Sequence, residues 1–158
     1  VREARLGDAV ELARLRWDFE AVNGGVQSRE TFAAEFGDWF QSASSSDRWA
    51  VVVAEPGPGR LCGCIFLQRV ERVPRPGGLG QAWGYVTNSF VDPEYRSKGL
   101  GSVMLRFLVE LARAKSFEFL IVWPSPESVS FYKRAGFQPV ALQHAGSGDS
   151  PPLELLLS

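Results

Sequence analysis

The chain of 158 residues has the size of one domain, so we expect residues 1–158 to form a single domain. Its composition, with 45% hydrophobic and 22% charged residues, argues against a disordered protein. A formal net charge of −1 is too small to attract nucleic acid or an anionic membrane over the whole surface. We therefore expect neither partner, and we expect any anion-binding site to be local.

The N-terminal half predicts two helices and a hairpin. Residues 1–4 are expected to form a short strand, and Asp8 is expected to cap a helix that ends at a glycine turn near Asn23. Phenylalanines recur every four residues after Ser28, which predicts a second helix. Apolar, β-branched runs at 49–54 and 60–73, joined by a Pro-Gly turn, predict two antiparallel strands.

The C-terminal half predicts strand-helix-strand crossovers. A strand at 82–91 is followed by the strongest helix signal, which begins at Gly99 and repeats apolar residues at i, i+3, i+4 and i+7. A strand at 119–123, a helix at 127–135 and strands at 137–142 and 153–157 complete the order. This order predicts an α/β (α+β mixed) fold, a mostly antiparallel twisted sheet of about seven strands with about four helices on its faces.

The cysteine and histidine counts bear on metal binding and location. Cys62 and Cys64 lie two apart on a predicted strand and share a face, where a disulfide between them would be strained. His144 is the single histidine, so four soft ligands for zinc are lacking and we expect no metal. Reduced cysteines, an N-terminus without an apolar signal core and the absence of a membrane-length apolar run favour a cytoplasmic protein.

The segment from Arg96 to Gly101, R-S-K-G-L-G, has the properties of an anion-binding loop. Glycines let the backbone approach a ligand closely, and the first turn of the following helix leaves its N–H groups without partners. The helix dipole and the side chains of Arg96 and Lys98 add positive charge. The spacing matches neither a Walker A loop nor a dinucleotide fingerprint, which disfavours a nucleotide-binding domain.

Two motifs together resemble a known family. R-x-x-G-x-G follows V-D-P-E-Y and opens an amphipathic helix, and F-Y-x-R-x-G-F follows about thirty residues later, at 131–137. This pairing is similar to motifs A and B of the GNAT superfamily of acyl-CoA-dependent N-acetyltransferases, and the order of elements is GNAT-like from Arg2 to Leu157. Acetyl-CoA is the co-substrate that this resemblance implies.

The resemblance also implies roles for individual residues. The backbone amides of the loop and first turn would hold the CoA pyrophosphate, with Arg96 beside them, and these amides belong to Lys98, Gly99, Leu100, Gly101 and Ser102. The strand end at Phe90 and Val91 would pair with the pantetheine arm. Tyr132 would protonate the CoA thiolate. Ser125 and Ser128 stand where relatives often have Asn and Ala, and Ser125 has a shorter reach toward the pantetheine arm.

The general base stays open at this point. Many relatives carry a glutamate on the strand before motif A, but residues 83–89 contain no carboxylate. Asp18, Glu20, Asp92, Glu94 and water relays are the alternatives. Three tryptophans could wall an acceptor pocket, and core packing is the other interpretation for all of them: Trp17, Trp83 and Trp123.

The function that follows is transfer of an acetyl group from acetyl-CoA to a primary amine, by direct attack within a ternary complex. A backbone N–H near Val91 would stabilise the oxyanion. The acceptor could be a small molecule or a protein amine, and the protein could form a homodimer. The competing hypothesis is a non-catalytic acyl-CoA-binding or sensing module on the same fold.

Overall fold

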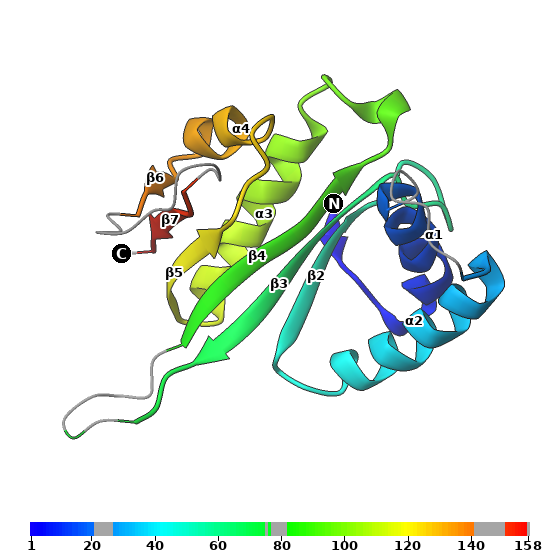
Figure 1. Ribbon diagram of the computed structural model, residues 1–158, viewed down its shortest axis with the longest axis horizontal. Helices are drawn as coiled ribbons and strands as arrows, with labels where there is room; N and C mark the ends of the chain where they lie inside the picture. The colour runs from blue at the N-terminus through cyan, green and yellow to red at the C-terminus, as the bar shows by residue number, and fades with distance from the viewer. Residues whose placement is uncertain (21–26, 75, 77–81, 141–150, 158) are drawn as a thin grey trace.

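A mixed sheet of seven strands in the order β1-β2-β3-β4-β5-β7-β6 runs through the molecule (Figure 1). The computed structural model describes residues 1–20, 27–74, 76, 82–140 and 151–157. The strands are β1 (Arg2–Glu3), β2 (Trp49–Ala54), β3 (Gly63–Glu71), β4 (Ala82–Val91), β5 (Phe117–Val122), β6 (Gln138–Pro139) and β7 (Leu153–Leu156). The β4–β5 pair is parallel and the other neighbours are antiparallel, so the predicted fold class is confirmed.

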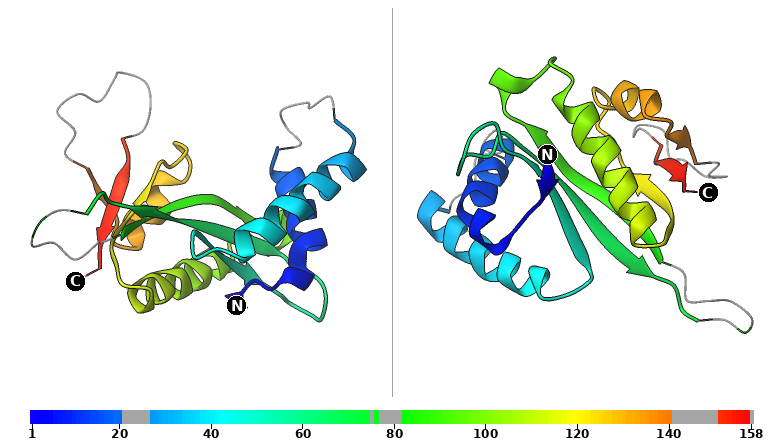
Figure 2. Two further views of the ribbon diagram at one scale, coloured as in Figure 1. Left: turned by 90° about the horizontal axis from the view of Figure 1, so that it is seen from below. Right: turned by 180° about the vertical axis from the view of Figure 1, so that it is seen from behind.

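Helices cover the two faces of the sheet separately (Figure 2). They are α1 (Ala9–Glu20), α2 (Arg29–Ser44), α3 (Leu100–Ala114) and α4 (Val129–Arg134), with 3₁₀ turns at Leu6–Asp8 and Pro93–Tyr95. One buried core joins α3 and α4 to β3, β4, β5 and β7, and a second joins α1 and α2 to β2, β3 and the end of β4. No helix in the described part of the chain is long and apolar enough to cross a membrane.

Several element boundaries differ from the sequence-based expectation. Asp8 directly precedes α1 but ends a 3₁₀ turn, and its carboxylate accepts from the preceding Arg5 N–H at 2.6 Å and from Arg2 rather than from the first amides of α1. β3 begins at Gly63 rather than at residue 60, and β5 begins two residues early, at Phe117. β6 is short and includes Pro139, which has no N–H to donate. The glycine turn after α1 and residues 141–142 lie outside the described residues.

β4 and β5 separate partway along their length. Their pairing runs to Val86 and Val122, whereas β4 continues to Val91. In the same stretch the register of β4 against β3 shifts, and Asn88 has a φ of 49°, as expected for an extra residue inserted in one strand. The result is a splay between two parallel strands, with the second half of β4 forming one side of it.

Candidate active site

The loop between β4 and α3 has a backbone built to expose N–H groups. We call residues 96–101 the glycine loop. Ser97 has a φ of 59° and Gly99 a φ of 79°, so the chain makes two left-handed turns, which only glycine adopts without strain. Gly99 is the N-cap of α3 and has no side chain to accept from the first amides of the helix. No side chain of the N-cap competes for these amides, so the predicted anion site remains a prediction that this geometry permits.

The two basic side chains of the glycine loop fold back onto the protein. The Arg96 Nε donates to the Val91 carbonyl oxygen at 2.8 Å, and its guanidinium lies 5.4 Å from the centre of the Phe90 ring. The Lys98 Nζ donates to the Glu94 carbonyl oxygen at 2.8 Å. Both charges are therefore engaged with the end of β4 and the 3₁₀ turn that precede the loop.

Val91 and Phe90 present different groups to the splay. The Asp92 N–H donates to the Cys62 carbonyl oxygen, and Phe90 pairs with Cys64, so these two residues direct their backbone groups toward β3. Val91 lies between them and directs its N–H and C=O toward the side that β5 has left. The Phe90 side chain packs in the α1–α2 core, 5.7 Å from Phe19. Of the two predicted residues, Val91 alone offers its backbone to an added strand.

Tyr132 reaches across the splay. Its hydroxyl donates to the Ser89 Oγ at 2.8 Å, which links α4 to the unpaired half of β4. The ring is 4% exposed, and this burial raises the pKa of Tyr132 above its usual value, although the bond to Ser89 opposes the rise. The phenol is thus held protonated, as a hydrogen-bond donor. Sequence reasoning missed Ser89, because no local pattern links residues 43 apart.

The first turn of α3 and α4 are in contact at Gly101. A Cβ on Gly101 would lie 3.4 Å from the Phe131 ring, so the absence of a side chain brings the glycine loop close to the helix that carries Tyr132. At the start of the same helix, the Ser125 hydroxyl donates to the Ser128 hydroxyl at 3.2 Å. The Ser128 hydroxyl in turn donates to the Ser125 carbonyl oxygen. The glycine loop and the helix that carries Tyr132 are therefore in contact, and the two serines lie at the start of that helix.

Three of the four carboxylates considered as general bases are paired with arginines. Arg14 contacts Asp18 at 3.0 Å and the buried Asp92 at 3.4 Å, and Arg16 contacts Glu20 at 2.7 Å. Glu94 is exposed on the 3₁₀ turn after β4. Asp18, Glu20 and Asp92 are therefore engaged in ion pairs within the protein, whereas Glu94 has no ion pair with any described residue.

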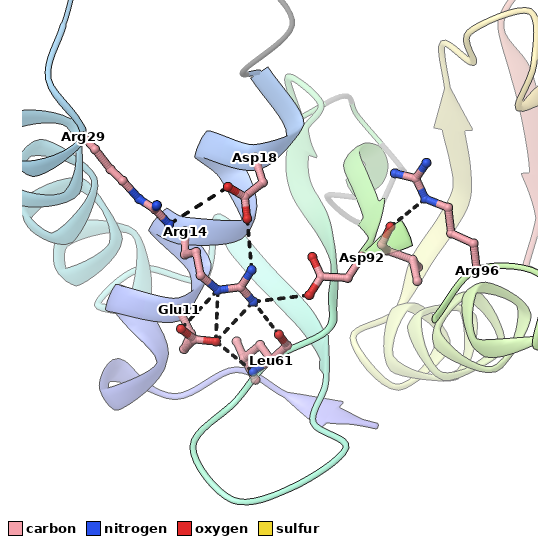
Figure 3. A network of polar contacts seen from close by, with 8 residues as sticks. Glu11, Arg14, Asp18, Arg29, Leu61, Asp92 and Arg96 are labelled. Carbon is pink, nitrogen blue, oxygen red and sulfur yellow. Dashed lines mark hydrogen bonds and ion pairs between the residues drawn. The ribbon is translucent and has the colours of Figure 1, made fainter. Parts of the chain in front are cut away.

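Arg14 is the centre of a network that the sequence did not predict (Figure 3). Its Nη2 donates to the Leu61 carbonyl oxygen at 2.6 Å, and Glu11 binds both Arg14 and the Leu61 N–H. The network joins α1 to the β2–β3 connection and to the end of β4. It fixes the strand end from which the glycine loop starts.

The three tryptophans do not gather in one pocket, and the two cysteines are buried. Trp83 and Trp123 lie on one sheet face, against Phe119 and Tyr85, whereas Trp17 packs on Phe32 of α2. Cys62 and Cys64 are both buried and free. Burial raises the pKa of Cys64 to about 12. Within the described residues, no group of three or more His, Cys, Asp or Glu side chains could hold a metal ion.

The glycine loop, the splayed strands and the motif around Tyr132 fit a known family model. The model of the acetyltransferase (GNAT) family matches residues 10–137. The chain belongs to the GNAT family. Two curated relatives are named glucosamine 6-phosphate N-acetyltransferase, and a third is named a probable one. The relative from Trypanosoma brucei brucei is 34% identical over 80 residues (51% of this chain, 52% of the relative), and the other two are from Oryza sativa subsp. japonica. The first rice protein is 31% identical over 112 residues, which cover 70% of this chain and 64% of that relative.

Solved structures show the same fold. A predicted acetyltransferase with acetyl-CoA from Clostridium acetobutylicum has a TM-score of 0.71 at 20% identity, covering 92% of this GNAT chain and 94% of that chain. Glucosamine-6-phosphate N-acetyltransferase from Arabidopsis thaliana has a TM-score of 0.69 at 20% identity, covering 94% and 97%. The matched segments span 52% and 64% of the lengths of the first two curated relatives. The similarity therefore shows a common family and not a common substrate.

Proposed function

We propose that this GNAT protein transfers the acetyl group of acetyl-CoA to the primary amine of a small molecule. The observation that carries the proposal is the Tyr132 hydroxyl, held 2.8 Å from Ser89 across the splay and beside the glycine loop. A buried phenol next to a place where a thioester can lie has the reach and the protonation state of a general acid.

In this proposal the glycine loop binds the pyrophosphate through the amides of Lys98, Gly99, Leu100, Gly101 and Ser102. The pantetheine arm pairs with the open backbone of Val91 as an added strand, which requires Arg96 to leave the Val91 carbonyl and turn toward the phosphates. Ser125 and Ser128 border the arm from the start of α4.

The chemical step follows from this placement. The neutral amine attacks the thioester carbonyl carbon, a C–N bond forms, and the oxyanion accepts from a backbone N–H near Val91. The C–S bond then breaks, Tyr132 donates its proton to the leaving thiolate, and the amine nitrogen loses a proton to water. Positioning of both substrates in one complex supplies much of the acceleration.

The relatives support a small-molecule acceptor, because two of them are named glucosamine 6-phosphate N-acetyltransferase and a third is named a probable one. The test is turnover of acetyl-CoA with a panel of amines, read as release of free thiol. Turnover with at least one small amine is expected. Tight CoA binding without turnover on any amine would instead favour an acyl-CoA-binding module.

A further inference from the structure

The sheet face opposite α3 carries a row of side chains that the proposed chemistry does not use. Val86, Val122 and Leu153 pack into the core beside α3. Their strand neighbours Tyr85, Ile121 and Glu154 therefore point to the opposite side, because side chains alternate along a strand. Pairing places Tyr85 beside Ile121 and Ile121 beside Glu154, so the three form one row across β4, β5 and β7.

Aromatic rings surround this row. Trp123 follows β5 and is 55% exposed. Its ring packs edge-on against the Tyr85 ring, with the two ring centroids 5.3 Å apart. The rings of Trp83 and Phe119 are stacked, with their centroids 5.8 Å apart and an interplanar angle of 9°. The helices α1 and α2 lie on this side of the sheet but over its β2–β3 part, and not over β5 and β7 (Figure 2).

Glu154 is the charged member of the row. The residue is half-buried, and its carboxylate has neither a hydrogen bond nor an ion pair with any described residue, in contrast to Asp18, Glu20 and Asp92. Arg72, whose guanidinium lies 5.4 Å from the centre of the Phe119 ring, is paired with Glu118 at 3.2 Å. An unpaired carboxylate on the same sheet face as the half-buried Tyr85 and the exposed Trp123 is complementary to an organic ammonium group.

The row lies at the entrance to the splay. Tyr85 precedes Val86, the last β4 residue paired with β5, and its phenol is close enough to raise the pKa of Tyr132 further. Strands lie about 4.8 Å apart, so Glu154 on β7 stands one strand beyond β5 and about 10 Å from β4. A short alkyl chain can therefore span the distance from an ammonium group bound at Glu154 to the splay.

We propose that the acceptor is a diamine, with one ammonium group bound by Glu154, its carbon chain lying against Tyr85 and Trp123, and its second nitrogen in the splay. This assignment rests on the proposed acetyltransferase function and names its substrate class. Two nitrogens are needed because an ammonium group bound to a carboxylate stays protonated and has no lone pair for attack. A sugar phosphate fits poorly, since its phosphate would meet the Glu154 carboxylate.

The experiment compares acceptors that differ only in the second amino group. Acetyl transfer is measured with 1,5-diaminopentane, with pentylamine and with glucosamine 6-phosphate, for the unmodified protein and for Glu154→Gln. We expect kcat/KM for the diamine to exceed that for the monoamine about 10- to 100-fold, the usual strength of a charged hydrogen bond. Glu154→Gln should remove that preference through KM and leave the monoamine unchanged.

Glu110→Gln is the matched control, because Glu110 is an exposed carboxylate on α3 with no role in the proposed site, and this variant should keep the diamine preference. An equal loss for both amines in Glu154→Gln would indicate a structural role and overturn the assignment. So would an unchanged diamine preference in that variant, or a preference of the unmodified protein for glucosamine 6-phosphate. Absence of turnover with every amine would refute the proposed function itself, which is a different result.

Discussion

Tyr132 owes its expected chemistry to its surroundings rather than to its residue type. The ring is buried between α4 and β4, and burial disfavours the phenolate. A tyrosine in water loses its proton near pH ~10, so the raised pKa extends the protonated form to still higher pH. The Tyr132 phenol is therefore a proton donor at neutral pH and above.

Replacing Tyr132 by phenylalanine tests this role. The hydroxyl matters only once the C–S bond begins to break, so we expect kcat to fall roughly 10- to 1000-fold, with acetyl-CoA affinity nearly unchanged. Steady-state kinetics with a good acceptor and calorimetric titration with CoA give the two values. Ser89→Ala is the control, since it removes the bonding partner and keeps the phenol, and it should lower kcat much less. Full activity of Tyr132→Phe would assign protonation of the thiolate to water.

The buried cysteines give a second prediction at this scale. Because burial raises the pKa of Cys64 to about 12 and also raises that of Cys62, neither thiol forms a nucleophilic thiolate near neutral pH. In the native protein, both should react slowly with a thiol-specific disulfide reagent at about pH 8, and both should react promptly in denaturant. Rapid labelling of the native protein would contradict the burial of both thiols and reopen a role for them in the reaction.

Single residues were predictable where a short motif specified them and not where distant segments meet. Gly99 and Tyr132 stand in recognisable spacings, and the structure brings both to the splay. Ser89, Arg14 and Glu154 carry no local signal. Their importance depends on the bulge in β4, on a contact between α1 and Leu61, and on the register of β7 against β5.

The glycine loop is the element whose conformation most clearly requires particular residues. Gly99 has open space around its Cβ position but a φ of 79°, whereas Gly101 has an ordinary backbone and a neighbour at 3.4 Å. Gly99→Ala is expected to cost about 1–2 kcal/mol of stability through backbone strain and to misalign the amides. Acetyl-CoA affinity should fall accordingly in calorimetric titration.

Substitutions at Gly101 test the packing of the glycine loop against α4 without changing its backbone conformation. Alanine there would add a methyl group at van der Waals distance from Phe131, so Gly101→Ala should keep both fold and affinity. Gly101→Val places two further carbons against Phe131 and should weaken CoA binding strongly. Equal affinities for the unmodified protein and a folded Gly101→Val variant would count against the loop as a pyrophosphate site.

The Arg14 network is expected to act on the element that it anchors. Arg14→Gln would leave Glu11 and the buried Asp92 without their cation, and partly buried charged hydrogen bonds contribute about 1–3 kcal/mol. Because Arg14 keeps 18% side-chain exposure, we expect the lower half of that range for the loss in free energy of unfolding. Denaturant titration measures the loss, and Arg29→Gln, an exposed member of the same network, should cost much less.

The type and order of the elements followed from hydrophobic periodicity, and their ends did not. The 3.6-residue repeat marked α3 with Gly99 as its start, but β3 and β5 begin where pairing with a neighbouring strand begins. Hydrophobic periodicity also could not predict the separation of β4 from β5. It results from the parallel pairing, which ends at Val86 and Val122 while β4 runs on to Val91.

For the whole molecule, the splay predicts that the co-substrate stabilises the fold. A ligand that binds the native state alone at 100 times its Kd adds about 2.7 kcal/mol to the free energy of unfolding. For a chain of this size that corresponds to a rise in Tm of roughly 5–10 °C. Thermal unfolding at increasing acetyl-CoA concentration measures the rise. Gly99→Ala should show a smaller shift at the same concentration, and an equal shift would place the binding elsewhere.

The unpaired half of β4 has a consequence for handling the purified protein. From Thr87 to Val91 this strand has no described strand beside it on the β5 side, and Arg96 covers the Val91 carbonyl. Such an edge is a template to which another polypeptide can add. Concentrated stocks kept without CoA should therefore self-associate during storage, as light scattering would detect, and a saturating amount of CoA should suppress the growth of these particles.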